Sequence, residues 1–105
     1  MVPILVISAA DSMELAQMIA SALIETGEAA CVNIIDGVRS VYRWEGKTCE
    51  ENELVLLIKT SEDRFEAVRS RIRKLHTYQL PEIIAVPIHA GDPEYLAWLS
   101  SSGGR

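Results

Sequence analysis

The stretch AACVNIIDGVRSVYRWEGKTCEENELVLLIKT, residues 29–60, decides the fold. Its first half alternates side chains as a strand does and is interrupted at Asp36-Gly37, where a bulge or bend fits. Its second half ends in an apolar run that predicts a second strand. Glu45-Gly46 lies between the halves as a turn, which places Trp44 opposite Lys47. The sequence therefore predicts a β-hairpin that is long for a chain of 105 residues.

The residues before this hairpin predict a strand and a helix. Residues 3–7 form a continuous apolar run, as expected for a strand buried on both faces in the middle of a sheet. Asp11 or Ser12 caps the helix that follows, and Gly27 ends it. The apolar residues of this helix fall on one face: Leu15, Ile19, Ala22 and Leu23.

The residues after the hairpin predict two more helices and one strand. Ser61 caps a helix whose arginines form a solvated face: Arg64, Arg69, Arg71 and Arg73. Residues 81–88 form the fourth strand, and Asp92-Pro93 begins a last helix. Residues 100–105 are expected to be a loose tail.

This order predicts an α+β fold, a ferredoxin-like β-α-β-β-α-β sandwich with an additional C-terminal helix. The length suits a single domain spanning residues 1–105. Two helices cover one face of such a sheet, yet the central strands are apolar on both faces. We therefore expect the second face to be buried by self-association.

Composition and charge exclude several classes of partner. The chain is 49% hydrophobic and 24% charged, and fifteen acidic against ten basic residues give a net charge of −5. This charge repels phosphate backbones and anionic membranes, so neither nucleic acid nor a membrane is an expected partner. The N-terminus lacks a basic region and reaches Asp11 too soon for a signal peptide, so we expect a cytoplasmic protein with reduced cysteines.

Five stretches together carry a resemblance to the CutA divalent-cation tolerance family. They occur in the right order and spacing over nearly the whole chain: AACVNI at 29–34, SVYRWEGK at 40–47, KT at 59–60, HTYQLPEI at 76–83 and DPEYLAWL at 92–99. The resemblance implies a tight ferredoxin-like homotrimer in which the long hairpin reaches a neighbouring subunit. It also implies a role in tolerance to divalent cations, copper above all, and an architecture like that of the trimeric PII signalling proteins, which bind small effectors between subunits.

The sequence departs from the family pattern at three positions. Glu28 stands where the family usually has leucine, and Thr77 follows His76 where proline is usual. Some members carry a copper-linked cysteine near the end of the first strand, and the aligned residue here is Ile7, which cannot ligate a metal. A copper site that depends on that thiol is therefore not expected.

Cys31 and His76 are the candidate metal ligands near the family motifs. A thiolate with an imidazole suits copper or zinc better than magnesium, although two ligands do not make a site. The alternatives are that Cys31 is a small buried hydrophobe and that His76 is a hydrogen-bonding residue at a helix C-terminus. A trimer could also bring such side chains together from two subunits.

Cys49 is expected to be a free thiol that binds soft metals adventitiously. In the predicted register Cys49 faces Tyr42, eleven positions from Cys31, or about 36 Å along the strand. An intramolecular disulfide is excluded in that register.

Two further sets of residues are assigned to subunit contacts. Tyr42, Trp44 and Trp98 are predicted at the interface, with core packing as the alternative. Charged groups on apolar strands are rarely buried without partners, which predicts an ion pair at the trimer boundary. The sharper hypothesis is an inter-subunit pocket of Lys59, Tyr78 and Glu82 for a small anion or metabolite.

No motif indicates an enzyme. The chain has no glycine-rich phosphate loop, no HExxH and no recognisable Ser, His and Asp set. The sequence therefore predicts a metal-binding or metal-responsive trimer without a catalytic activity. The alternative is a PII-like scaffold that binds a small effector between subunits and acts on a partner protein.

Overall fold

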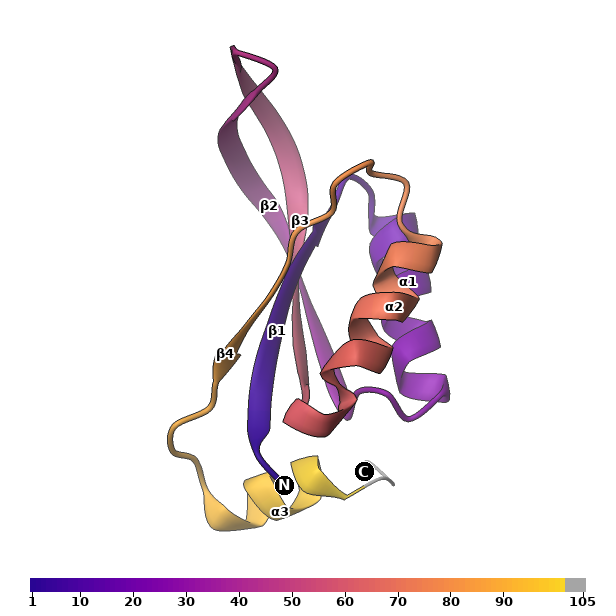
Figure 1. The fold of residues 1–105 in the computed structure, drawn as a ribbon, viewed down its shortest axis with the longest axis vertical. Helices are drawn as coiled ribbons and strands as arrows, with labels where there is room; N and C mark the ends of the chain where they lie inside the picture. Colours follow the sequence, from indigo (N-terminus) through magenta and orange to yellow (C-terminus); the bar gives the residue numbers. More distant parts are fainter. Residues whose placement is uncertain (102–105) are drawn as a thin grey trace.

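The computed structural model describes residues 1–101, and it confirms the predicted α+β, ferredoxin-like order of elements (Figure 1). Four antiparallel strands form one sheet in the order β2-β3-β1-β4. The strands are β1 (Pro3–Ala10), β2 (Cys31–Trp44), β3 (Lys47–Ser61) and β4 (Ile83–Pro87). The helices are α1 (Met13–Glu25), α2 (Phe65–Leu75) and α3 (Pro93–Ser100), with a 3₁₀ turn η1 (Glu62–Arg64) before α2. No helix among residues 1–101 is both long and apolar enough to cross a membrane.

The hairpin of β2 and β3 has the predicted register. Trp44 pairs with Lys47, and Tyr42 pairs with Cys49. The two-residue turn needs positive φ at both positions, and Glu45 and Gly46 adopt 50° and 77°. As Figure 1 shows, the hairpin extends well beyond the rest of the sheet.

The helix ends follow the predicted capping signals in two cases. The Ser12 side chain accepts a hydrogen bond from the Leu15 N–H at the start of α1, and the Asp92 side chain accepts one from the Tyr95 N–H at the start of α3. Gly27 follows α1 with φ of 75°, a conformation that favours glycine.

Three predicted boundaries were wrong. Ser61 ends β3 and precedes the 3₁₀ turn, so its side chain makes no cap for α2. β4 covers residues 83–87 of the predicted 81–88. Ser100 belongs to α3 rather than to a tail, and residues 102–105 lie outside the described part of the chain.

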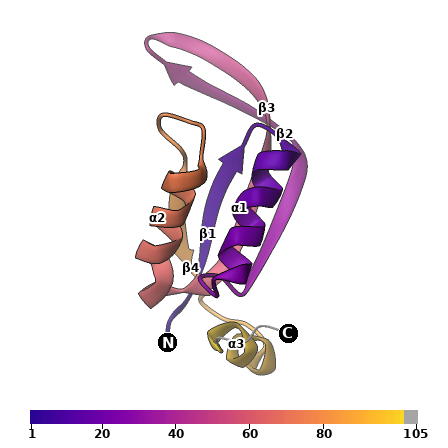
Figure 2. The same cartoon turned by 90° about the vertical axis from the view of Figure 1, so that its right-hand side faces the viewer.

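The core lies between the sheet and the two helices α1 and α2, which cover the same face (Figure 2). Alternate residues of β1 and β3 point toward the helices because side chains of a strand alternate between faces. Ile4, Val6, Leu56 and Ile58 are all buried there. They pack with the apolar face of the helices: Leu15, Ile19, Leu23, Val68 and Ile72.

The other face of the sheet, here called the open face, lies away from α1 and α2 (Figure 1), and α3 reaches only its end, where the Lys59 ammonium lies over the Tyr95 ring. It carries the remaining alternate residues, whose register places Ile35 opposite Val55 and Ile84 opposite Ile7. Ile35, Ile84 and Val86 are 44%, 52% and 43% exposed in the single chain. An apolar surface of this kind on a small protein indicates a site of association.

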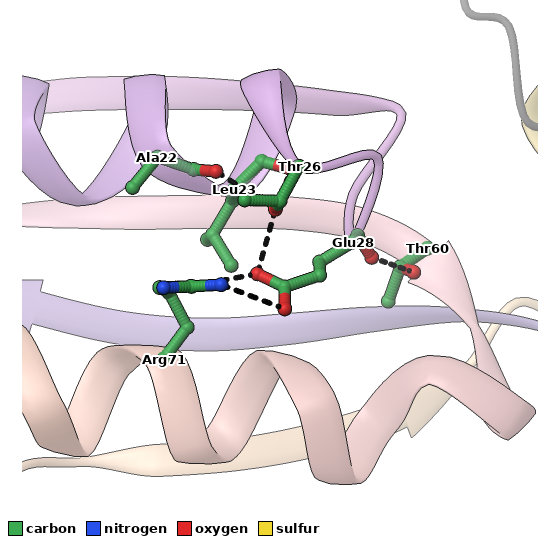
Figure 3. A network of polar contacts seen from close by, with 6 residues as sticks. All are labelled: Ala22, Leu23, Thr26, Glu28, Thr60 and Arg71. Atoms are coloured by element: carbon green, nitrogen blue, oxygen red, sulfur yellow. Dashed lines mark hydrogen bonds and ion pairs between the residues drawn. The ribbon is translucent and has the colours of Figure 1, made fainter.

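Glu28 joins the connection between α1 and β2 to two other elements (Figure 3). The Arg71 side chain donates to both carboxylate oxygens, with Nε to Oε1 at 2.9 Å and Nη2 to Oε2 at 3.3 Å. The Thr26 hydroxyl lies 2.7 Å from Oε1, and the Thr60 hydroxyl donates to the Glu28 carbonyl at 2.7 Å. Arg71 therefore does not belong to the solvated face predicted for α2, because the Glu28 carboxylate pairs with it.

We predict that Glu28→Gln lowers the free energy of unfolding by about 1 kcal/mol at pH 7, since it removes the charge of a partly buried ion pair. The hydrogen bond from Arg71 holds the pKa of Glu28 below its ordinary value of 4.5. The stabilisation is therefore complete above pH 4.5 and is lost as the pH falls further. Urea unfolding of the natural chain and the variant between pH 3 and 7 measures this difference.

The control is Glu66→Gln, which removes the charge of an ion pair with Arg69 at a carboxylate that is 74% exposed. We expect its effect to stay within about 0.5 kcal/mol. Equal losses in the two variants would contradict the role assigned to Glu28.

Candidate functional site

A groove of about 780 Å³ lies where the hairpin leaves the body of the sheet. Its lining combines aromatic rings with carboxylates: Tyr42, Trp44, Tyr78, Glu51, Glu53 and Glu82. Arg43 is the basic residue in the lining. The groove is therefore acidic and aromatic, a combination that attracts cations.

A bulge in β2 places two of the aromatic side chains in this groove. The register shifts between Ile35 and Val38, around Gly37 with φ of 75°. Before the bulge, odd-numbered residues of β2 face the open side, and after it the even-numbered residues do. Tyr42 and Trp44 consequently lie on the same face as Glu51 and Glu53, whereas an unbroken strand would direct them to the opposite face.

Tyr78 connects the segment between α2 and β4 to the hairpin. Its hydroxyl donates to Glu53 Oε2 at 2.6 Å, and its ring centroid lies 4.4 Å from that of His76. Burial first, and then the hydrogen bond to Glu53, raise the pKa of Tyr78 above its usual value of 10.0. The phenol therefore stays protonated as the donor and fixes the orientation of the Glu53 carboxylate.

Both ring nitrogens of His76 make hydrogen bonds. The Tyr78 backbone N–H donates to Nδ1 at 3.1 Å, so Nδ1 is the unprotonated nitrogen. Nε2 then carries the proton and donates to the Ala9 carbonyl at 2.6 Å. His76 also follows the last residue of α2, so this geometry agrees with the hydrogen-bonding alternative given above. A metal ion could bind either nitrogen only by displacing one of these contacts.

Tyr42 and Glu51 form a second phenol and carboxylate pair in the groove. The hydrogen bond to Glu51, with smaller contributions from burial and from neighbouring charges, raises the pKa of Tyr42 to about 12. Glu51 was not among the residues singled out from the sequence. The alternation along β3 together with the Asp36-Gly37 bulge is the signal that could have placed it on this face.

The two predicted metal ligands lie apart in a single chain. Cys31 pairs with Lys59, which pairs with Leu5 of β1. His76 instead contacts Ala9, four residues farther along β1, or roughly 13 Å. Cys31 is a half-buried free thiol on the open face, and Cys49 is a second free thiol that lines the groove.

The residues of the predicted inter-subunit pocket also lie at two separate places in a single chain. Tyr78 and Glu82 both line the groove, but Lys59 does not. The Lys59 ammonium lies 5.7 Å from the ring centroid of Tyr95, near α3 at the opposite end of the sheet. Trp98, predicted at the interface, packs against Tyr95 with ring centroids 5.3 Å apart. The other predicted interface residues, Tyr42 and Trp44, are both 38% exposed in the groove.

Known proteins resemble this chain along nearly its whole length. A family model described as CutA1 divalent ion tolerance protein matches residues 4–102. The divalent-cation tolerance protein CutA of Thermus thermophilus is 48% identical over 93 residues, which cover 89% of this chain and 90% of that protein.

Solved structures show the same fold. A divalent cation tolerance protein from Thermus thermophilus superimposes with a TM-score of 0.93 at 45% identity, covering 97% of this chain and 99% of that one. CutA1 from Oryza sativa superimposes with a TM-score of 0.93 at 39% identity, covering 99% of this chain and 94% of that one.

We predict that Glu51→Gln lowers the pKa of Tyr42 from about 12 toward its ordinary value of 10.0, because the carboxylate charge no longer opposes ionisation of the phenol. NMR of ring-labelled tyrosine during an alkaline titration resolves the individual side chains. The matched control is Glu50→Gln, since Glu50 points to the other face of β3 and pairs with Arg39 at 3.1 Å. An equal fall in both variants would refute the pairing of Tyr42 with Glu51.

Proposed function

The chain belongs to the CutA1 divalent ion tolerance family, and on this premise we propose that it serves in tolerance to divalent cations as a homotrimer that binds copper or another divalent metal. The observation that carries the proposal is the open face of the sheet. Apolar side chains of all four strands meet there, and Ile84 and Val86 are half exposed in the single chain. Association of copies through this face buries them, at about 25 cal/mol per Å² of apolar surface.

Heterologous contacts that close a ring suit such a sheet. The two edge strands, β2 and β4, differ in length and sequence, so one copy presents two unlike edges to its neighbours. In a head-to-tail arrangement each copy contacts the next through two unlike surfaces, and such contacts close into a ring under rotational symmetry. Three copies form the smallest such ring beyond a dimer.

The metal part of the proposal needs ligands from more than one subunit. Within residues 1–101 of one chain, no three His, Cys, Asp or Glu side chains come together in a group that could hold a metal ion. The donors of a single chain therefore do not fit a resident metal. Cys31 has the most suitable position for a shared site, because its thiol lies on the face that assembly would bring against another copy.

The groove supports a second candidate function, a PII-like scaffold that binds a small effector and acts on a partner protein. Its volume of about 780 Å³ is in the range of small-molecule sites. Its three glutamates favour a cationic effector, whereas the sequence led us to expect a small anion or a metabolite. The cytoplasmic location and the absence of catalytic activity stay predictions.

We predict that Val86→Lys converts the trimer to smaller species, since it places a charge on the open face where the natural side chain is 43% exposed. Light scattering coupled to gel filtration at micromolar concentration gives the mass. Met18→Lys is the control, because Met18 is 47% exposed on α1, on the other side of the sheet. A monomeric natural chain, or trimers in both variants, would rule out assembly through this face.

We further predict that copper binding depends on Cys31. Calorimetric titration under reducing conditions should show stoichiometric binding that is lost in Cys31→Ser and kept in Cys49→Ser. His76→Ala should keep it as well, because both ring nitrogens of His76 are already engaged. Binding that is absent, or lost only in Cys49→Ser, would favour the effector-binding scaffold instead.

A further inference from the structure

Lys59 is a charged side chain without a charged partner among residues 1–101. It lies half-buried on the open face of β3, between Cys31 on one side and Leu5 on the other. Its ammonium contacts the Tyr95 ring at 5.7 Å. The ion pairs of residues 1–101 all involve arginines, so Lys59 takes part in none of them. If association buried this surface, a carboxylate partner would offset the free-energy cost of removing the Lys59 ammonium from water.

The groove lies on the same face of the sheet and has more acidic than basic side chains in its lining. Glu51 and Glu53 already accept hydrogen bonds from the phenols of Tyr42 and Tyr78. The Glu82 carboxylate makes no ion pair or side-chain hydrogen bond within the described chain. Its backbone is nevertheless fixed, because the Ser8 hydroxyl donates to the Glu82 carbonyl at 2.7 Å. The Glu82 side chain thus starts from a fixed point of the backbone, is exposed in the single chain, and its carboxylate is available to a cation.

Lys59 and the groove cannot meet within one chain. Lys59 lies six positions from Glu53 along β3, or about 20 Å. Both features face the same side of the sheet, at opposite ends of it. Complementary charges at opposite ends of one surface suit head-to-tail contacts, in which the Lys59 end of one copy meets the groove of the next.

We propose that the groove of each subunit receives the Lys59 ammonium of a neighbouring copy, with Glu82 as its main partner. This inference rests on the homotrimer proposed above and assigns the residues that set its register. The pocket of Lys59, Tyr78 and Glu82 predicted from the sequence is then assembled from two chains. The ion pair contributes mainly to the specificity of the arrangement, because the cost of desolvating both charges offsets much of their attraction.

Zero-length cross-linking of the natural protein tests the contact directly. Trimers are assembled from isotopically heavy and light chains and treated with a carbodiimide, which joins an amine to a carboxylate that it touches. Mass spectrometry should find the Lys59 peptide joined to the Glu82 peptide, with one heavy and one light half. Trimers without this mixed product would overturn the inference and leave the proposed assembly intact, whereas a monomer by light scattering would overturn both.

Charge reversal supplies a second measurement. Lys59→Glu should accelerate the exchange of subunits between heavy and light trimers roughly tenfold. The double variant Lys59→Glu with Glu82→Lys should return the rate to within about threefold of the natural value. Lys74→Glu, an exposed change in the last turn of α2, is the control. Equal rates for Lys59→Glu and Lys74→Glu, or no recovery in the double variant, would overturn the pairing.

Discussion

The open face depends on one constraint, the coverage of a four-stranded sheet by only two helices. Along β1 and residues 54–58 of β3, side chains alternate between the two faces, and both sets are largely apolar. α1 and α2 bury one set completely, which produces a core that includes Val6, Leu56 and Ile58. The other set, with Ile84 and Val86 beside it, is left half exposed. Stability and assembly are therefore connected, because the same strands supply the core and the surface that a second copy would cover.

The bulge in β2 has the largest effect of any local feature on the candidate site. One irregularity between Ile35 and Val38 exchanges the faces of all residues beyond it. Tyr42 and Trp44 thereby join the glutamates of β3 on the open face. Without it, the groove would keep its carboxylates and lose two of its aromatic walls.

The hydrogen bonds around the groove orient its carboxylates without supplying an opposite charge. Two phenols donate hydrogen bonds to Glu51 and Glu53, and neither donor carries a positive charge. Neither carboxylate makes an ion pair within residues 1–101, so both are oriented and available to a cation. By contrast, Glu28 is neutralised by Arg71 at the other side of the sheet and acts on the fold alone (Figure 3).

The sequence by itself determined the elements, the hairpin register and the family, because each rests on local or linear signals. Alternation, capping residues and the Glu45-Gly46 turn act over a few positions, and the register of Tyr42 with Cys49 follows from the turn alone. Only the tertiary structure decided which distant residues meet. It placed His76 on Ala9, far from Cys31, and Lys59 far from Glu82, since these contacts depend on how the chain returns across the sheet after α2. It also paired Arg71 with Glu28, forty-three positions away, which helical periodicity alone had assigned to solvent.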